Sequence, residues 1–493
     1  MQQDLAQQRG IGFSHVSRRK KTMSLTKVSY SLINGAQVNV LDYGAVGDGT
    51  TNDTAAIQAA LNSLTAGGTV WFPQGTYLVS TLTIPNTGAR GISLVGAGSW
   101  TWSGITPTGP TKIKANGASP IFTVPAPSSG TTFSNFIFDG DTTSTTAING
   151  LASRITVTNC FASKFTAAGV TMTEGLCQIL FCVLTGNTGD GLRMASDGRV
   201  QGCYLSANGG AGLVSYGTGL GGTLVSNNEM AFNKSHGINI YATSSLGNIF
   251  ISGNYIEDNG IGATVGTFVS QIYCDGTASK FLSNIKIIHN YVSTVHVDDG
   301  VIVDGAHFVN CSQVVYANAV HLCGAGSNTA ERYSVYFDNV DQFCVSDISI
   351  RANYDSALRV ENDCNTYTIN NISVLNSAFK PSGIYAVVLD SSNASVASNI
   401  VVADYSGVSP GNGINSTIPI SNCYYYGPGI NTISTGFLYT PTFGNVGTNI
   451  NFTNTKYIPQ ATAPSTPAAG QVYYDSGTNK LYCWNGSSWN ALF

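Results

Sequence analysis

Charged side chains are scarce in this sequence. Asp, Glu, Lys and Arg make up only 10% of its 493 residues, against roughly 25% in an average globular chain. The formal net charge of −4 provides no basic field for a phosphate backbone, and the one dense cationic run, Arg18 to Lys21, falls in an apparent tail. We therefore expect no nucleic-acid partner.

Long apolar runs and paired cysteines are missing as well. No stretch approaches the roughly 18 consecutive apolar residues of a membrane helix. The N-terminus has no apolar core of the secretory type, so we expect neither a membrane partner nor a secretory signal peptide. The 11 cysteines form no Cys-x-x-Cys pair and no metal spacing with histidine, which predicts free thiols, no metal and no bound cofactor.

The segment after residue 37 predicts one short amphipathic helix. Asn52 or Asp53 can cap it, and Gly67-Gly68 ends it. Its apolar positions recur with helical spacing: Ala56, Ile57, Ala60, Leu61 and Leu64. A single helix ahead of many strands suits a cap over one end of a stack of strands.

The middle of the chain contains an internal repeat, in which the glycines Gly169, Gly191, Gly212 and Gly237 align. One column of small or amide residues reads Cys160, Cys182, Cys203, Asn228, Asn254, Asn290 and Asn318. Two positions later every residue is apolar: Ala162, Leu184, Leu205, Met230, Ile256, Val292 and Val320. Each repeat therefore predicts one rung of a coil, whose strands put alternate residues inward against the next rung.

These patterns predict an all-β fold, a parallel β-helix solenoid with an N-terminal capping helix and a small C-terminal β-hairpin module. We divide the chain into residues 1–36, a tail or anchoring peptide; 37–125, the capping helix and first coils; and 126–430, the central β-helix. Residues 431–493 form a Pro/Ala/Thr linker and a β-rich trimerisation or binding module.

The motif Asn39 to Ala45 (NVLDYGA), followed by GDGT and NDTAAIQ, resembles the N-terminal segment of pectate-lyase-type β-helices. Phage tailspike depolymerases and polygalacturonase or rhamnogalacturonase relatives share this segment. The resemblance implies a right-handed parallel β-helix, and a homotrimer on the virion tail that cuts bacterial capsule, exopolysaccharide or O-antigen. Its N-terminal tail would bind another phage tail protein. The Gly-His-Gly element of a polygalacturonase site does not occur, so the chemistry does not follow from the resemblance.

Hydrolysis of a glycosidic bond needs two carboxylates. Glu229 and Glu257 are expected on adjacent rungs of one outward face, with backbones on the order of 8 Å apart, which suits an inverting mechanism. Tyr204, Tyr255 and Tyr291 share that face and can contact sugar rings. We predict that Glu229 and Glu257 are catalytic and that the three tyrosines bind substrate.

Three further groups of residues are candidates. Asp298 and Asp299 form a second catalytic possibility, in a cluster with Asp304, His296 and His307. The 36-residue step from Asn254 to Asn290 predicts an inserted loop that carries two substrate-binding acids, Asp258 and Asp275. A third outward column holds Asp190 and His236, two rungs apart, with the candidate Arg193 and Asn239 beside it. A lyase could use a base there, with Arg193 neutralising a uronate carboxylate.

The function predicted from the sequence is glycosidic hydrolysis of a bacterial surface polysaccharide. A polysaccharide lyase that acts on a uronate-containing glycan is one alternative. A receptor-binding spike without catalytic activity, or a structural tail or adhesin component, is another. Hydrolysis produces new reducing ends without ultraviolet absorbance, a lyase produces an absorbing unsaturated uronate, and a pure binder produces neither.

Overall fold

The structure is a computed structural model. It describes residues 37–86, 91–195, 197–219, 221–277, 282–295, 301–323, 333–351, 356–375, 385–390, 395–403, 412–416, 418, 420–421, 424–426, 459–460, 463, 472–475, 477–478 and 480–491. The chain divides into two compact units, Met1–Val183 and Leu184–Phe493. The domain boundaries expected at residues 125 and 430 stay predictions.

Unit 1 is built from short strands that pair in parallel with strands of the preceding and following coil. Its elements are β1 (Val38–Asn39), η2 (Val40–Tyr43), β2 (Asp48–Asn52), α1 (Thr54–Asn62), β3 (Gly68–Phe72), β4 (Gly75–Val79), β5 (Leu82–Thr83), β6 (Ile92–Gly96), β7 (Thr101–Ser103), β8 (Thr106–Thr108), β9 (Thr111–Ala115), β10 (Phe122–Val124), β11 (Thr132–Ser134), β12 (Ile137–Asp139), β13 (Ile148–Gly150), β14 (Thr156–Thr158), β15 (Phe161–Ser163), β16 (Ala168–Met172) and β17 (Gln178–Leu180). Three parallel ladders result: β5-β10-β13-β16, β1-β3-β6-β11-β14-β17 and β2-β4-β9-β12-β15. β7 and β8 form an antiparallel hairpin. The next strand, β18 (Val183–Thr185), spans the division between the units.

The expected helix is confirmed as α1. Its buried residues are Ile57, Ala60 and Leu61, three of the apolar positions that the helical spacing had selected. The residue before it, Asp53, is buried and uses its carboxylate to accept hydrogen bonds from the backbone N–H groups of Val46 and Gly47, at 2.7 and 3.1 Å. The Asp53 side chain therefore fastens the glycine-rich turn of the motif to the start of the helix.

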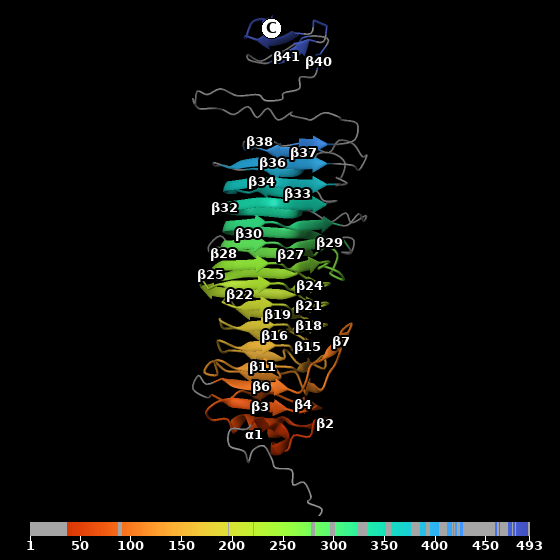
Figure 1. Ribbon diagram of the computed structural model, residues 1–493, viewed down its shortest axis with the longest axis vertical. Coiled ribbons are helices and arrows are strands. Elements are labelled where there is room, and N and C mark those ends of the chain that lie inside the picture. The colour runs from red at the N-terminus through yellow and green to blue at the C-terminus, as the bar shows by residue number, and fades with distance from the viewer. Residues whose placement is uncertain are drawn as a thin grey trace, which may run out of the picture. The chain divides into compact units, whose positions relative to one another are not determined.

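Unit 2 is a coil with longer strands. Its elements are β19 (Asp190–Ala195), β20 (Arg199–Gln201), β21 (Tyr204–Ser206), β22 (Leu213–Gly219), β23 (Thr223–Ser226), β24 (Glu229–Ala231), β25 (Ile238–Ser252), β26 (Tyr255–Glu257), β27 (Phe268–Asp275), β28 (Leu282–Ile288), β29 (Tyr291–Thr294), β30 (Ile302–Ala317), β31 (Val320–Cys323), β32 (Tyr333–Arg351), β33 (Ser356–Glu361), β34 (Asn365–Leu375), β35 (Tyr385–Leu389), β36 (Val396–Ala403), β37 (Asn412–Ser416), β38 (Ile420–Ser421) and β39 (Tyr424–Tyr426). Figure 1 shows these strands stacked in chain order.

Three parallel ladders run through unit 2, and several long strands belong to more than one. The A ladder is β19-β22-β25-β27-β30-β32-β33-β35-β37. The B ladder is β20-β23-β25-β28-β30-β32-β34-β36, continued by β38 and β39. The C ladder is β21-β24-β26-β29-β31-β32. The predicted fold class, an all-β right-handed parallel β-helix, is confirmed.

Asparagines at one bend hold successive rungs of unit 2 in register. The Asn254 Oδ1 accepts hydrogen bonds from the backbone N–H and the side-chain amide of Asn228, both at 3.0 Å. Asn254 donates in the same way to Asn290 Oδ1 on the next rung. All three asparagines are buried, and the residue before each has a left-handed backbone. Each amide therefore satisfies buried backbone groups at a bend that strand pairing cannot reach.

The predicted repeat is wrong by one residue at its last rung. Tyr291 pairs with Val320, and Val292 pairs with His321. His321 is therefore the inward residue, while Val320 is 41% exposed. Asn318 lies one position before the ladder and is exposed. His321 has an apolar residue on each side, Val320 and Leu322. The repeat therefore selected Val320 as the inward residue in place of the histidine.

The C-terminal segment contains the predicted hairpins. Strands β41 (Val472–Asp475), β42 (Lys480–Trp484) and β43 (Trp489–Ala491) are antiparallel, and β40 (Pro459–Gln460) pairs with β41 in parallel. The rings of Tyr473 and Trp489 pack edge to face at 4.6 Å. Within the described ranges, no helix has the length and apolar character that crossing a membrane requires.

Replacing Asn254 with alanine should destabilise the protein. The change removes the side-chain acceptor of the buried Asn228 backbone N–H, one hydrogen bond of the Asn228 side-chain amide, and the side-chain donor to Asn290 Oδ1 and the Val225 carbonyl. We expect a loss of at least about 2 kcal/mol of unfolding free energy, measured by chemical denaturation. Asn62→Ala is the control, because the Asn62 amide is exposed on α1, and it should change stability by less than about 0.5 kcal/mol. Equal effects of the two substitutions would contradict this role for the ladder.

Candidate active site

The outward face of the A ladder carries two parallel columns of polar and aromatic side chains. We call the first the arginine column: Arg193, Val214, Asn239, Tyr273, His307, Tyr336 and Arg359. The second, two residues further along each strand, is the tyrosine–acid column: Tyr216, Tyr241, Asp275, Val309, Asp338 and Glu361. Alternate residues such as Ile272, Cys274 and Phe308 are buried in the core, because successive side chains on a strand point to opposite faces.

The tyrosine–acid column presents two stacked rings and then carboxylates. The rings of Tyr216 and Tyr241 stack with centroids 6.0 Å apart at 21°, and Asp275 occupies the next rung. Burial raises the pKa of the Asp275 carboxyl, against the lowering effects of a hydrogen bond with Tyr273 and of the charge of His307. Asp338 lies two strands further on, with Val309 between them. At about 4.8 Å per strand, the two backbones are about 9.6 Å apart.

His307 is the residue of the arginine column that lies between Tyr273 and Tyr336. It is 6% exposed, and the rings of Phe268, Tyr273 and Tyr336 surround it with centroids 5.3, 5.4 and 4.6 Å away. Its Nδ1 lies 2.8 Å from the fully buried Asp304 carboxylate, an ion-pair distance at an angle unfavourable for a hydrogen bond. Among the described residues, its Nε2 has no hydrogen-bond partner.

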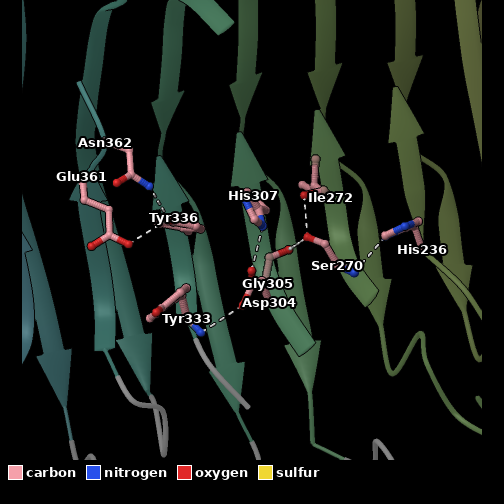
Figure 2. A network of polar contacts seen from close by, with 10 residues as sticks. All are labelled: His236, Ser270, Ile272, Asp304, Gly305, His307, Tyr333, Tyr336, Glu361 and Asn362. Atoms are coloured by element: carbon pink, nitrogen blue, oxygen red, sulfur yellow. Dashed lines mark hydrogen bonds and ion pairs between the residues drawn. The ribbon is translucent and has the colours of Figure 1, made fainter. Parts of the chain in front are cut away.

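His236 joins this cluster from the turn before β25. Its Nδ1 accepts a hydrogen bond from the Ser270 backbone N–H at 2.9 Å, so this nitrogen carries no proton. The imidazole stacks on Tyr273 at 4.9 Å and 14°. Burial lowers the pKa of His236 to about 4, despite the opposing hydrogen bond from Ser270. Figure 2 shows the contacts that run from His236 through Ser270 toward Asp304 and His307.

The two arginines of the arginine column are each paired with an acid. Arg193 donates through Nε to the Asp190 carboxylate, and its side chain remains half exposed. Arg359 donates to Glu361 at 2.7 Å, and Glu361 also accepts a hydrogen bond from the Tyr336 hydroxyl at 2.8 Å. Figure 2 shows the hydrogen bond between Tyr336 and Glu361. Within the described ranges, Asp275 and Asp338 are the carboxylates of this face that form no ion pair with an arginine.

Glu229 and Glu257 lie on the C ladder, as the repeat predicts. Glu229 pairs with Tyr204 on one side and with Tyr255 on the other, and Glu257 pairs with Ala231, two residues after Glu229. Burial raises the pKa of Glu229, and the charge of Glu257 raises it further. Tyr255 donates a hydrogen bond to Glu257 at 2.8 Å and stacks on Tyr291 at 4.4 Å and 3°. The expected adjacency on one face is present, and the catalytic role stays a prediction.

The inserted loop carries less of the site than expected. Asp258 begins it but is only 1% exposed, with a left-handed backbone. The chain is already back in strand β27 by residue 268, so Asp275 is a strand residue and its expected loop position is wrong. Asp298, Asp299 and His296 lie outside the described residues. Arg193 and Asn239 share one column, two rungs apart. His236 contacts Ser270, Phe268 and Tyr273, and its role as a base stays a prediction.

Sequence reasoning missed most of the tyrosine–acid column, including Tyr216, Tyr241, Asp338 and Glu361. The aligned glycines do give its register as far as Tyr241, which lies four residues after Gly237. Beyond that rung the signal ends, because Gln271 occupies the position before Ile272 that Gly237 occupies before Ile238. The residues two positions after the aligned glycines include Arg193 and Asn239. The residues four positions after them include Tyr216 and Tyr241, so the same alignment could have predicted the stacked tyrosines.

This arrangement provides the groups for acid–base chemistry. Asp275 is a carboxyl with a raised pKa, Asp338 is a second carboxylate on the same face, and the phenols of Tyr273 and Tyr336 are tied to acids. Such perturbed carboxyl groups on an exposed face mark candidate functional sites. In the part of the chain that the structure describes, no three His, Cys, Asp or Glu residues are grouped to hold a metal ion.

Comparison with protein families gives one match that covers most of the coil. The model of the family described as "Rhamnogalacturonase A/epimerase, pectate lyase-like" matches residues 37–313. That range includes both A-ladder columns as far as Val309, and also the Glu229 and Glu257 rungs. It ends before Asp338 and Glu361.

Curated proteins match over short segments. The mannuronan C5-epimerase AlgE3 of Azotobacter vinelandii is 52% identical over 66 residues, which are 12% of this chain and 4% of the epimerase. Plasmin and fibronectin-binding protein A of Streptococcus pneumoniae is 53% identical over 45 residues, 8% of this chain and 6% of that protein. The matched segments thus span 4 to 12% of the length of these curated relatives.

Solved structures with a similar fold have low sequence identity. The catalytic unit of an alpha-1,3-glucanase from Streptomyces thermodiastaticus aligns with a TM-score of 0.48 and 16% identity, over 80% of this chain and 69% of that chain. The tailspike protein 3 of bacteriophage CBA120 aligns with a TM-score of 0.46 and 13% identity, over 92% of this chain and 69% of that one.

Acid should destabilise the protein through His236. Its pKa falls from 6.5 to about 4 on folding, so the neutral form stabilises the protein fully above about pH 6.5, and this contribution is lost as the pH falls toward 4. The contribution is about 3 kcal/mol. His236→Gln should show a smaller fall in the denaturation midpoint between pH 7 and pH 4. The exposed His289→Gln is the control and should retain the wild-type slope. An unchanged slope in His236→Gln would refute this account.

Proposed function

The chain belongs to the rhamnogalacturonase A/epimerase, pectate lyase-like family, and on that basis we propose that it hydrolyses internal glycosidic bonds of a bacterial surface polysaccharide. One observation carries the proposal. Asp275, a carboxyl whose pKa is raised by burial, shares an outward column with Asp338 two strands away. A proton donor and a proton acceptor at that spacing are what an inverting glycosidase requires.

The proposed mechanism assigns one step to each carboxyl. Protonated Asp275 donates its proton to the glycosidic oxygen as the bond to the anomeric carbon breaks. Asp338 removes a proton from the water molecule that attacks that carbon from the opposite side. The backbone separation of about 9.6 Å fits carboxyl groups that are roughly 6.5 to 9.5 Å apart, the range for inversion. The small outward side chain between them, Val309, leaves room for the sugar and the water.

Tyr216 and Tyr241 provide the proposed neighbouring subsites. Their rings are stacked on one another in the same column, one and two rungs before Asp275. Aromatic faces and edges pack well against the apolar faces of sugar rings. A glycan that lies along the column would therefore contact the tyrosines and present a linkage to Asp275.

The lyase alternative has one observation in its favour, the Asp304–His307 contact with the unpartnered Nε2 of His307. A histidine oriented by a carboxylate can serve as a base. A lyase also needs a positive charge to neutralise the uronate carboxylate. Arg193 and Arg359 are already engaged by Asp190 and Glu361, and further carboxylates occupy the face. Because the two arginines are neutralised by acids and other carboxylates lie nearby, this face suits a neutral glycan better than a uronate, which favours hydrolysis.

The sequence-based pair Glu229 and Glu257 is the competing assignment for the same reaction. The raised pKa of Glu229 beside Glu257 supports it. The two assignments place the reaction on different ladders, so single substitutions separate them. Loss of turnover in Glu229→Gln with retention in Asp275→Asn would move the hydrolytic site to the C ladder.

We also propose the biological setting that the resemblance of the N-terminal motif implies, a homotrimeric phage tailspike. The aromatic cluster of Tyr473, Trp484 and Trp489 in the C-terminal strands is a candidate contact between subunits. A spike without catalytic activity would bind the polysaccharide and leave it intact. Light scattering of the purified chain measures the subunit number directly.

Hydrolysis predicts a specific product pattern and one essential acid. On a panel of bacterial capsular and O-antigen polysaccharides, the wild-type chain should shorten at least one polymer and create reducing ends without ultraviolet absorbance. Asp275→Asn should lower that rate by about 10² to 10⁴. Asp341→Asn is the matched control, since Asp341 is an exposed acid on the B ladder, and its rate should equal that of the wild type. Absorbing products would identify a lyase, and intact polymers with measurable binding would identify a spike without activity.

The pH profile should respond to Tyr273. Asp275 must be protonated to act as the acid, so activity falls as the pH rises through its pKa. The Tyr273 hydrogen bond lowers that pKa, and Tyr273→Phe should therefore shift the alkaline limb of the turnover profile to higher pH. Tyr241→Phe should leave the limb in place, because among the described residues Tyr273, and not Tyr241, is hydrogen-bonded to Asp275. A shift of the Tyr273→Phe limb to lower pH would exclude Asp275 as the acid.

A further inference from the structure

The C ladder carries a second aromatic row that the proposed reaction does not use. Tyr204, Glu229, Tyr255 and Tyr291 occupy consecutive outward positions on β21, β24, β26 and β29. Glu229 is the one residue in this row without a ring. The tyrosines on either side of it, Tyr204 and Tyr255, therefore lie two strands apart, about 9.6 Å by backbone.

That interval matches the thickness of one sugar ring. Carbon atoms in contact lie about 3.5 to 4.0 Å apart, so a ring held between two aromatic faces needs about 7 to 8 Å. The remaining space accommodates the pucker of a pyranose. Tyr255 is 39% exposed, and its other face is covered by Tyr291 at 4.4 Å and 3°. Its free face is therefore directed toward the Glu229 rung.

Tyr255, one wall of the interval, is held in place before any ligand arrives. The Tyr255 hydroxyl donates to Glu257 Oε2 at 2.8 Å, and the stacking on Tyr291 fixes the plane of the ring. Glu229 lies on the strand between the two tyrosines, and the Glu257 carboxylate lies at the hydroxyl end of Tyr255. Acceptors in this position suit the hydroxyl groups of a neutral sugar and repel a uronate. Preorganised aromatic residues of this kind lose little entropy on binding.

The geometry points to a non-catalytic binding slot for one neutral pyranose ring, between Tyr204 and Tyr255 with Glu229 at its base. This site lies on a different ladder from Asp275, and it goes beyond the proposed hydrolysis. A polymer held in the slot while another part of it lies on the A ladder would be bound at two points. Two-point binding raises affinity for the polymer without any effect on a short oligosaccharide.

Binding is tested without any need for turnover. The full chain carrying Tyr216→Ala, Tyr241→Ala and Asp275→Asn lacks the proposed A-ladder contacts and isolates the slot. Saturation-transfer NMR with glucose, galactose, mannose, rhamnose and N-acetylglucosamine should detect at least one bound sugar in this background. Adding Tyr255→Ala should weaken that binding about tenfold or more, because it removes one wall of the slot. Tyr255→Phe retains the ring and is the matched control, with binding within about threefold of the background.

Two results would overturn the slot. One is the absence of saturation transfer from all five sugars in the isolating background. The other is equal binding before and after Tyr255→Ala, with circular dichroism showing that both chains are folded. Neither result depends on hydrolysis, so failure of the slot and failure of the A-ladder mechanism are separate outcomes.

The kinetic counterpart uses the single variant Tyr255→Ala on whichever polymer the wild-type chain shortens. Its KM for the polymer should rise about tenfold, while kcat/KM for an oligosaccharide too short to reach both ladders stays at the wild-type value. Equal losses on polymer and oligosaccharide would place Tyr255 in the hydrolytic site instead and would contradict the slot.

Discussion

The return of the chain to the same register on every rung is the constraint on which the rest of the structure depends. Parallel pairing sets Tyr273 beside His307, and His307 beside Tyr336, with no freedom to slide by one residue, because a slip would turn buried residues such as Ile272 and Phe308 toward water. The amide ladder through Asn228, Asn254 and Asn290 fixes this register at the bends. Columns of aligned side chains on the outer face are a direct product of that constraint.

Sequence reasoning predicted the coil well because its signals are local and repeated. The helix α1, the asparagine ladder and the adjacency of Glu229 and Glu257 all follow from spacing along the chain. The prediction was wrong where one rung broke the rule. His321, an inward histidine bonded to Tyr316, stands where the apolar pattern would place valine, and the register there was shifted by one residue.

The A-ladder site could be predicted only in part, for a physical reason. Arg193, His236, Asp275 and His307 were all candidates, but they were assigned to separate clusters. Whether these residues share one face depends on the residue at which the chain re-enters the ladder after residue 258. No aligned glycine identifies that residue in the sequence. The raised pKa of Asp275 has the same origin, since it results from burial among residues of neighbouring rungs, a property that no spacing rule contains.

The bend after Asn259 shows how this coil accommodates extra chain. A second amide ladder runs through Asn208, Asn233 and Asn259, and the partner of Asn259 is Gln271, only twelve residues later. Gln271 supplies the acceptor that the next rung would otherwise provide, so the residues between them leave the coil and return without disturbing the rungs on either side. Phe268, which touches both His236 and His307, lies in this interval, where the chain re-enters the coil as β27. An insertion at this bend can therefore change the border of the histidine cluster while strand pairing keeps Asp275 and Asp338 in register.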